Sequence, residues 1–348
     1  MKRSIYTAEV IAIVFVLASL ATAQSYTVTD LGTLTGDSIS GGASLNSAGE
    51  VAGYVSPTVQ HGFFWSSSRG LLDLPPLPGG NFSVAVGINA GGVVAGTSTT
   101  KNGGNDHAVL WINGKVQDLG TLPGGTTSVG SAINASRQVA GGSDTSGTDT
   151  HAILWSKAGG MQDLGVLGGG GGYSLAEGIN RSGEVVGESS IPGSINFHGF
   201  SWTKVSGMQD LGILPSGGFS VAYGVNDLGQ IAGYADCEPL CFHAVLWGAD
   251  AKIQDLGSLP HSTESSAFSI NDAGHAVGWA LLPGSVYHGF VWSQNAGMLD
   301  LNDLIPTGSG WTIEFAFAIN DNDQITGRGT INGQEHAFLM TRTGTFAK

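Results

Sequence analysis

The sequence predicts an all-β fold, a seven-bladed β-propeller of four-stranded blades. Three observations predict it. A set of markers recurs seven times along the 348 residues, each repeat reads as four short strands, and each end of the chain supplies what the other end lacks. Repeats of ~40–50 residues with four strands each are typical of propeller blades, whereas β-helix repeats are much shorter.

Four markers define the repeat, and they follow one another in a constant order. They are an Asp-Leu pair, an Asn that closes a small-x-Asn step, a His, and a Trp four residues after that His. The markers are Asp30, Asp73, Asp118, Asp163, Asp210, Asp255 and Asp300; Asn46, Asn89, Asn134, Asn180, Asn226, Asn271 and Asn320; His61, His107, His151, His198, His243, His288 and His336; and Trp65, Trp111, Trp155, Trp202, Trp247 and Trp292, with Met340 in the seventh Trp place.

The second unit illustrates the expected blade. Its strands are expected at residues 83–88, 93–97, 107–111 and 115–119. Residues 89–92 and the pair Asn113-Gly114 read as hairpin turns, because Asn and Gly tolerate the positive φ that such turns need. Two other units carry Arg137 and Asp323 in place of the turn glycine, and looser or differently bent turns are expected there.

The chain ends predict how the ring closes. Residues 26–31 read as a fourth strand with no strands before it, and residues 336–340 as a third strand with no fourth after it. Pairing the N-terminal strand with the C-terminal blade completes seven blades and leaves no open sheet edge. Residues 24–348 are therefore expected to form a single propeller domain.

The composition excludes several classes of protein. There are 57 glycines, more than twice the usual ~7% share, but they lack the three-residue period of collagen. Hydrophobic residues make up 41%, too many for a disordered chain. The net charge is −14 and the 13 basic residues form no patch, so no nucleic-acid partner is expected. The high net charge favours a monomer.

Residues 1–23 read as a secretory signal peptide. Lys2 and Arg3 are followed by an apolar stretch at 10–20 and by the small-x-small sequence Ala21-Thr22-Ala23. The apolar part is shorter than the ~20 residues of a membrane span. We expect cleavage near Ala23, release to the periplasm or the exterior, and no membrane insertion.

The two cysteines, Cys237 and Cys241, are expected to form one local disulfide, which export permits. A metal site is the alternative, with His243 nearby, but it needs more ligands than these. No metal and no cofactor is therefore expected.

The repeats resemble a known family. The triplets that carry the likeness are His61-Gly62-Phe63, His107-Ala108-Val109, His151-Ala152-Ile153, His198-Gly199-Phe200, His243-Ala244-Val245, His288-Gly289-Phe290 and His336-Ala337-Phe338. With Asp-Leu-Gly-x-Leu-Pro-Gly-Gly at 118–125 and Gly-Ile-Asn at 87–89, they are similar to the extracellular HAF-repeat (His-Ala-Phe) family of secreted bacterial proteins. The resemblance covers most of residues 26–340. It implies export and a repeat architecture, but no activity.

Each unit also places a Ser, a His and an Asp at one face of the expected blade. The clearest sets are Ser83, His107 and Asp118; Ser128, His151 and Asp163; and Ser174, His198 and Asp210, while the seventh unit has Glu314 in the serine place. A catalytic triad has the same residues. A nucleophile is needed only once, however, so a structural Asp–His–Ser chain within each blade is the favoured interpretation. No catalytic residue is assigned.

The Trp row is expected to pack between blades, because one aromatic at a fixed position in each unit suits a core. The candidate ligand contacts are other aromatics, Phe197, Tyr287 and Trp311. Phe197 and Tyr287 end the loops between second and third strands, which vary most between units; Trp311 precedes the first strand of the seventh blade. Variation on one face of a regular scaffold is where binding is usually built.

The favoured function is a secreted binding module that recognises a glycan, a cell-surface protein or a matrix ligand through its variable loops. One alternative is a propeller glycoside hydrolase or polysaccharide lyase, with Glu177 and Glu314 as channel carboxylates. Another is a purely structural extracellular component. Residues 321–323 hint at a calcium loop but coincide with the ordinary Asn-x-x-Gly turn.

Overall fold

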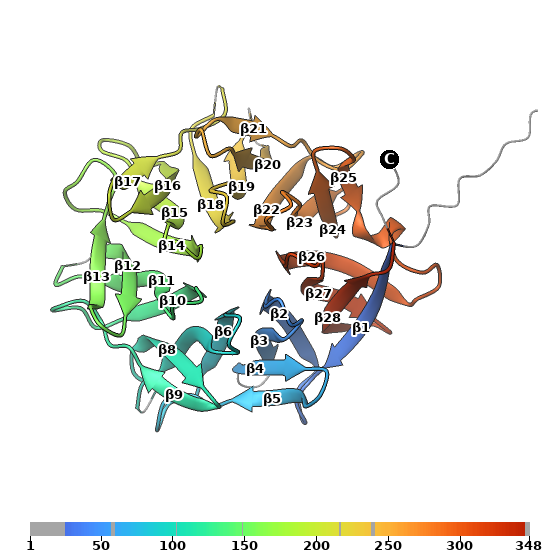
Figure 1. The fold of residues 1–348 in the computed structure, drawn as a ribbon, viewed down its shortest axis with the longest axis horizontal. Helices are drawn as coiled ribbons and strands as arrows, with labels where there is room; N and C mark the ends of the chain where they lie inside the picture. Colours follow the sequence, from blue (N-terminus) through green and yellow to red (C-terminus); the bar gives the residue numbers. More distant parts are fainter. Residues whose placement is uncertain are drawn as a thin grey trace, which may run out of the picture.

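A computed structural model describes residues 25–344, apart from 57–59, 102, 148, 216 and 238–240. It confirms the predicted fold: seven four-stranded antiparallel sheets are arranged around a central axis (Figure 1). The expected signal peptide, residues 1–23, lies outside the described residues. Across the described ranges, no helix is long and apolar enough to cross a bilayer.

The blades follow one another along the chain. Blades one to three consist of β2 (Ile39–Leu45), β3 (Val51–Ser56), β4 (His61–Ser66) and β5 (Gly70–Leu74); β6 (Ser83–Ile88), β7 (Val94–Thr99), β8 (Asp106–Ile112) and β9 (Lys115–Asp118); and β10 (Ser128–Ile133), β11 (Val139–Asp144), β12 (Thr150–Ser156) and β13 (Gly160–Gly165). Blades four and five consist of β14 (Ser174–Ile179), β15 (Val185–Ser190), β16 (Phe197–Thr203) and β17 (Gly207–Asp210); and β18 (Ser220–Val225), β19 (Ile231–Asp236), β20 (Phe242–Trp247) and β21 (Ile253–Asp255). Blade six consists of β22 (Glu264–Ile270), β23 (Ala276–Leu282), β24 (Val286–Ser293) and β25 (Gly297–Asp300). Blade seven combines β26 (Trp311–Ile319), β27 (Ile325–Ile331) and β28 (Gln334–Arg342) with β1 (Tyr26–Gly32).

The first and last strands of the chain close the ring, as predicted. β1 pairs antiparallel with β28, from Tyr26 opposite Arg342 to Asp30 opposite Phe338. The sheet order β1-β28-β27-β26 makes β1 the outer strand of blade seven. Because Tyr26 is also fully buried, β1 is held by packing as well as by the strand ladder.

The hydrophobic core is divided among the blade interfaces. Seven clusters of buried residues occur among the described residues, and each joins two adjacent blades. Between blades one and two, for example, Trp111 packs with Ala52 and Leu74. Each of the seven Trp or Met markers belongs to, or packs against, a different cluster, which agrees with the interpretation of that row as core.

A glycine in each second strand explains part of the glycine content. A Cβ on Gly96 would collide with the Val84 carbonyl of the inner strand and press on the Trp111 ring. The other six blades repeat the collision with the inner-strand carbonyl, at Gly53, Gly141, Gly187, Gly233, Gly278 and Gly327. Only glycine lets the bulged inner strand approach its neighbour so closely.

The Asn markers close the turns between first and second strands. In blade two, the Asn89 side-chain oxygen accepts from the N–H groups of Gly91 and Val93, which fixes the turn. The expectation of looser turns at Arg137 and Asp323 is wrong. Both residues adopt positive φ, 59° and 55°, and make the same turn bond as the glycines, because the asparagine holds the conformation.

The same asparagines form a ring around the axis. Each side-chain amide donates to the main-chain carbonyl of the next blade's asparagine, at 2.9 to 3.2 Å. All seven residues are buried. Seven hydrogen bonds therefore link the inner hairpins into one closed circle at one mouth of the channel.

Candidate functional site: the aromatic wall of the channel

The innermost strands line the channel, and a β-bulge in each aims one side chain inward. In β14, Ala176 pairs with Gly187 and Gly178 with Val186, so Glu177 is left unpaired. A bulge of this kind re-aims a side chain. The corresponding bulge residues are Ala43, Val86, Ser131, Glu177, Tyr223, Phe268 and Phe317. Blades one to three thus present small groups to the channel, and blades four to seven a carboxylate and three aromatic rings.

The bulge residues line a cavity of about 610 Å³, whose wall includes Glu177, Tyr223, Phe268 and Phe317. Small residues such as Val86 and Ser131 leave space on the opposite side. Inner-strand aliphatic side chains such as Ile133 and Ile270 line both this cavity and the depression at the asparagine ring. The volume suits a small or medium-sized ligand.

Nine aromatic rings form a continuous network in blades five to seven. Neighbouring ring centroids lie 4.9 to 6.4 Å apart. The members are Phe219, Tyr223, Tyr234, Phe242, Phe268, Trp279, Tyr287, Phe315 and Phe317, and we call them the aromatic wall. None is fully buried, in contrast to Trp111 and Trp247 of the core row. The aromatic wall is thus a surface with unfilled contact area.

The three predicted ligand contacts have different settings. Tyr287 is 36% exposed and lies 4.9 Å from Phe315, so it belongs to the aromatic wall. Phe197 packs edge-on against Tyr173, with centroids 5.4 Å apart, in blade four. Trp311 instead packs edge-on against the buried Phe338 and joins the core of blades six and seven. The structure therefore places Tyr287 at the aromatic wall and Trp311 in the packing between blades six and seven.

Blade four carries two neighbouring carboxylates, Glu177 in the cavity wall and Glu188 on the adjacent strand. Burial raises the pKa of Glu177 to about 7, and the nearby charge of Glu188 adds to the effect. Burial also raises the pKa of Glu188, although a hydrogen bond with the Tyr173 hydroxyl opposes the shift. Among the described residues, no lysine or arginine forms an ion pair with either group.

An arginine lies at the other end of the aromatic wall. The Arg328 guanidinium stands 4.8 Å above the Phe315 ring and forms an ion pair with Glu335 at 3.2 Å. It also hydrogen-bonds the Tyr54 hydroxyl. Burial raises the pKa of Tyr54, with the arginine charge acting in the opposite direction. The positive charge at this end of the site, on Arg328, is therefore paired with the carboxylate of Glu335.

Comparison with known proteins supports the propeller fold. A scan of protein-family models found no match, and neither did a search of curated proteins. Among solved structures, the extracellular domain of a proposed one-component system from B. thetaiotaomicron has a TM-score of 0.54 at 8% identity, over 92% of this chain and 40% of that one. A puromycin hydrolase mutant complexed with PGG has a TM-score of 0.53 at 13% identity, over 86% of this chain and 50% of that one. A gluconolactonase from Xanthomonas campestris has a TM-score of 0.42 at 12% identity, over 94% of this chain and 93% of that one. At such identities the likeness shows the fold alone.

The repeated histidines and aspartates pair in every blade. The distance from His Nδ1 to the nearest aspartate oxygen is 2.6 to 3.1 Å. In blade two, Asp118 also accepts from the N–H of Gly120, so it turns the chain toward the next blade while it holds His107. His151 with Asp163 and His198 with Asp210 repeat both contacts.

The serines do not complete an Asp–His–Ser chain within a blade, contrary to expectation. Ser128 donates to the Gly120 carbonyl and accepts from the Ala108 N–H, both in the preceding blade. Its single hydrogen is used by that carbonyl, so it cannot also be donated to a histidine. Ser83 and Ser174 make the equivalent bonds. The serine therefore joins neighbouring blades.

The junction before blade seven is built differently. Ile313, not Glu314, lies at the register of the serines, opposite Gly329 and therefore level with His336. The side chain of Asn302, which follows β25 in the short 3-10 helix η1 (Leu301–Asp303), exchanges two hydrogen bonds with the Ile313 backbone. Glu314 accepts from the Thr330 hydroxyl and is a bulge residue of β26.

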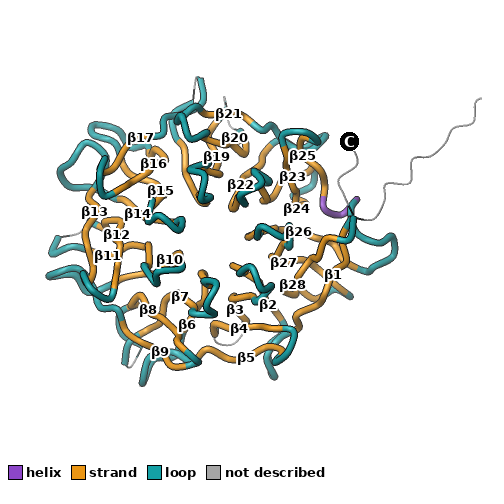
Figure 2. Tube along the Cα trace, viewed as in Figure 1, coloured by secondary structure: helices purple, strands orange, loops and turns teal. Residues whose placement is uncertain are grey.

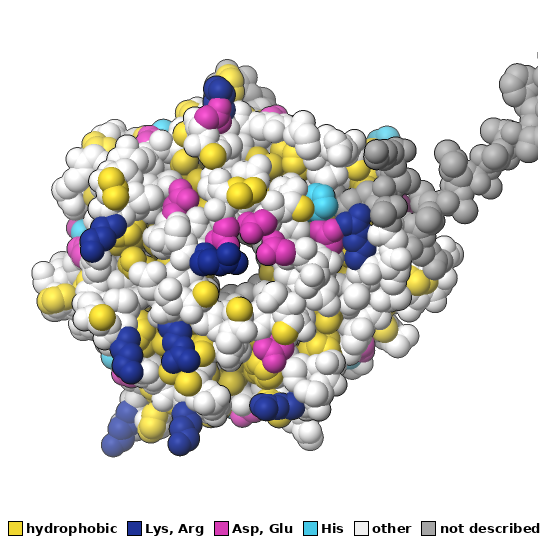
Figure 3. Space-filling model, viewed as in Figure 1, with side chains coloured by type: hydrophobic (Ala, Val, Ile, Leu, Met, Phe, Trp, Pro, Cys, Tyr) yellow, Lys and Arg dark blue, Asp and Glu magenta, His cyan; other side chains and the backbone are white. Residues whose placement is uncertain are grey.

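The mouth of the channel that holds the asparagine ring also carries a line of aspartates. Asp227, Asp272 and Asp321 each accept a backbone N–H from the preceding blade, at 2.8 to 2.9 Å. Arg181 forms an ion pair with Asp227 at 3.0 Å. Figure 3 shows acidic side chains beside Lys or Arg around the central opening. These carboxylates therefore already accept hydrogen bonds from backbone N–H groups of the protein.

Asp323, in the suggested calcium loop, is engaged as well. It contacts His275 at 2.7 Å and forms an ion pair with Arg342. Burial acts to raise the pKa of Asp323, but the hydrogen bond and charge of His275 and the charge of Arg342 outweigh it and hold the pKa below its usual value. These contacts give the carboxylate a bridging role between blades six and seven.

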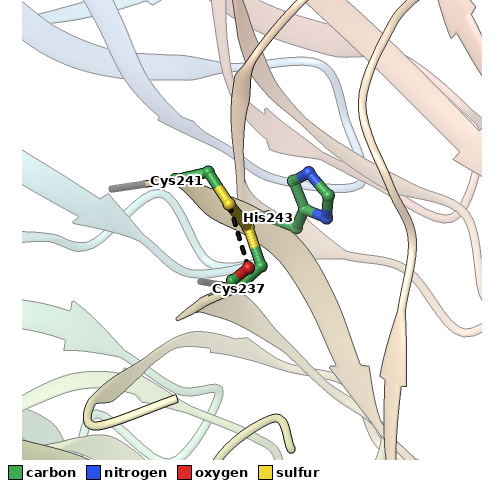
Figure 4. Close-up of side chains that lie close together, drawn as sticks. All are labelled: Cys237, Cys241 and His243. Carbon is green, nitrogen blue, oxygen red and sulfur yellow. Dashed lines mark hydrogen bonds between the residues drawn. A yellow bond between two sulfur atoms is a disulfide. The ribbon is translucent and has the colours of Figure 1, made fainter. Parts of the chain in front are cut away.

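Cys237 and Cys241 are joined by a disulfide in the loop of blade five, next to His243 (Figure 4). The three side chains offer ligand atoms within 4.8 Å of one another. Both sulfurs are occupied by the disulfide, and His243 is held by Asp255 at 3.0 Å. Three ligands are also fewer than the four of a structural zinc site. The residues therefore fit a loop staple better than a metal centre.

Most of the aromatic wall was not found from sequence, although a signal exists. The residue directly after each second-strand glycine lies opposite the residue that follows the repeat histidine. Framework positions hardly change between units, but this one reads Tyr54, Thr97, Gly142, Glu188, Tyr234, Trp279 and Arg328. Comparing the seven repeats with one another would have indicated this position as one that varies between blades.

Proposed function

We propose that this protein is an exported binding protein of the HAF-repeat type that holds a carbohydrate against the aromatic wall of its channel. Export is supported by the signal sequence at residues 1–23 and suits the Cys237–Cys241 disulfide. The HAF-type assignment rests on the repeated His triplets together with the Asp-Leu-Gly-x-Leu-Pro-Gly-Gly and Gly-Ile-Asn motifs.

One observation carries the binding proposal. Nine incompletely buried rings form a continuous wall over blades five to seven, while the equivalent places in blades two and three hold small residues. Packing of the scaffold requires no such asymmetry, because blades two and three form without those rings. Aromatic surface left unfilled beside a cavity is typical of a ligand site.

The polar groups around the aromatic wall favour a carbohydrate. A sugar ring presents apolar C–H groups that pack on an aromatic face, and hydroxyls that need partners around its edge. Glu177 and Glu188 at one end and Arg328 and Glu335 at the other supply acceptors and donors. A flat apolar ligand would leave the Glu177 carboxyl, which lines the cavity, without a polar partner, at a cost.

The test is a glycan array with the purified chain 24–348, followed by affinity measurements on each hit. Trp279→Ala should weaken binding about thirtyfold, as for a buried aromatic anchor, and Trp279→Phe should restore much of it. Leu228→Ala is the matched control, because Leu228 is 62% exposed beside an asparagine-ring turn. Absence of any glycan hit, or equal affinities for Trp279→Ala and Leu228→Ala, would contradict the proposal.

Catalysis is a second candidate, favoured by one observation. A carboxyl with a pKa of about 7, such as Glu177, is protonated often enough to act as a general acid. Incubation of each array hit with the protein, followed by chromatography, tests this candidate. Product release that is lost in Glu177→Gln while binding persists supports a hydrolase or lyase; unchanged ligand supports binding alone.

A further inference from the structure

Blades four and five place two carboxylates and a group of aromatic rings in one part of the channel. Glu177 and Glu188 come from β14 and β15, adjacent strands of blade four. Tyr223 and Tyr234 come from β18 and β19 of the next blade and lie with ring centroids 5.8 Å apart at an interplanar angle of 25°. Burial raises the pKa of both tyrosines; the charges of Glu177 and Glu188 add to the shift of Tyr223, and that of Glu188 adds to the shift of Tyr234.

This pocket lacks a positive partner within the part of the chain that the structure describes. Glu177 makes no hydrogen bond or ion pair there, although it lines the cavity. Glu188 has the Tyr173 hydroxyl as its hydrogen-bond partner, and that group is neutral. The cations near the channel are used elsewhere, since Arg181 pairs with Asp227 and Arg328 with Glu335. Two enclosed carboxylates without a counter-charge are costly in the free protein.

The chemistry of this pocket suits a cation of a particular kind. Aromatic faces attract ammonium groups, and the attraction grows when the site is partly desolvated. Carboxylates add charge-assisted hydrogen bonds to N–H donors. A strongly hydrated metal ion would gain nothing from the Tyr223 and Tyr234 rings, whereas an ammonium group on a carbon skeleton uses rings and carboxylates together.

We propose that the channel binds a saccharide that carries a free amino group, an amino-sugar oligomer. Its ammonium group lies between the two carboxylates of blade four and the tyrosine rings of blade five, and its further sugar units pack along Phe268, Phe317 and Trp279. This inference rests on the proposed carbohydrate-binding function and specifies the class of sugar.

The probes are three β-1,4-linked hexamers that differ in one substituent: glucosamine, N-acetylglucosamine and glucose. Affinities are measured by calorimetry with the chain 24–348 at pH 7 and low salt. The glucosamine hexamer should bind at least about tenfold more tightly than the other two, because one charge-assisted contact contributes about that factor. The difference should shrink as salt is raised.

Substitutions at the two glutamates test whether they cause the preference for the amino sugar. Glu177→Gln and Glu188→Gln keep the side-chain shape, and each should reduce the preference for the amine; the double variant should abolish it while neutral sugars still bind. Asp303→Asn is the matched control, since it removes a charge from an exposed place on η1 at the outer rim of the ring (Figure 2). Circular dichroism of each variant checks folding.

The outcomes separate the two proposals. Equal or tighter binding of a neutral hexamer, or a preference that survives the double variant, overturns the amino-sugar inference and leaves carbohydrate binding standing. No binding of the three hexamers or of any array glycan overturns both. If Glu177→Gln fails to fold, Tyr223→Leu gives the same comparison from the aromatic side.

Discussion

The side-chain amide of Asn320 donates a hydrogen bond to the main-chain carbonyl of Asn46 at 2.9 Å, and so joins the last blade to the first. The residues are 274 positions apart in the sequence. The bond is the seventh of a closed ring, and each asparagine in it also fixes its own hairpin. One residue type therefore shapes the turn and joins the blades at the same time.

The asparagine ring predicts a large cost for a small change. Asn226→Ala removes the donor to the Asn271 carbonyl and the acceptor for the N–H groups of Leu228 and Gln230. We expect a loss of about 3 kcal/mol in the free energy of unfolding, since several buried polar groups lose partners. Urea unfolding measures it, with Leu228→Ala as control. Equal midpoints would show that the ring contributes little.

Ring closure by β1 predicts unequal truncations. Deleting residues 24–32 removes the strand that pairs with β28 and the buried Tyr26, and should lower the melting temperature strongly. Deleting 346–348 should have almost no effect. Calorimetry on both truncated chains tests this, and similar melting temperatures would refute the importance of the closing strand.

The disulfide predicts a modest effect on stability. Cys237 and Cys241 should be oxidised in exported protein, and replacing both by serine should cost less than the ~3 kcal/mol expected for a 15-residue loop, because their loop is shorter. Mass spectrometry after alkylation counts free thiols, and denaturant titration measures the cost. Two free thiols in exported material would contradict the prediction.

The His–Asp pairs predict that blades respond alike. His151→Ala removes the contact with Asp163, and His198→Ala the contact with Asp210. Each should cost about 1 kcal/mol or less, because the aspartates are exposed to water. Ligand affinity of the folded variants should stay unchanged. A single histidine whose loss abolished function without lowering stability would revive a catalytic interpretation.

Glu177 predicts a pH dependence of stability. Its pKa rises from 4.5 in the unfolded chain to about 7 in the folded protein, so the folded state holds a proton more tightly. This favours folding below pH 4.5, and the advantage is lost as pH rises through about 7. Relative to Glu177→Gln, the wild type should therefore be less stable at pH 8 than at pH 5. Melting curves at both pH values decide it, and parallel curves would contradict the predicted shift.

The sequence by itself determined the architecture of this protein. Seven repeats, turn residues at constant places and complementary chain ends were enough to predict the blades and the closing strand, because each of these is a local or periodic property. Packing of the Trp row between blades could also be predicted, because every blade must cover its neighbour with a similar surface.

Only the tertiary structure decided what the repeated polar residues touch and where a ligand site lies. Ser128 hydrogen-bonds to the preceding blade, and Asn320 hydrogen-bonds to the first blade. These contacts depend on how neighbouring blades pack, and the sequence of one repeat does not specify that packing. Trp311 packs in the core and Trp279 belongs to the aromatic wall, although both are tryptophans outside the repeated row. The direction of a side chain depends on bulges and register, and these follow from the packing of strands far apart in the sequence.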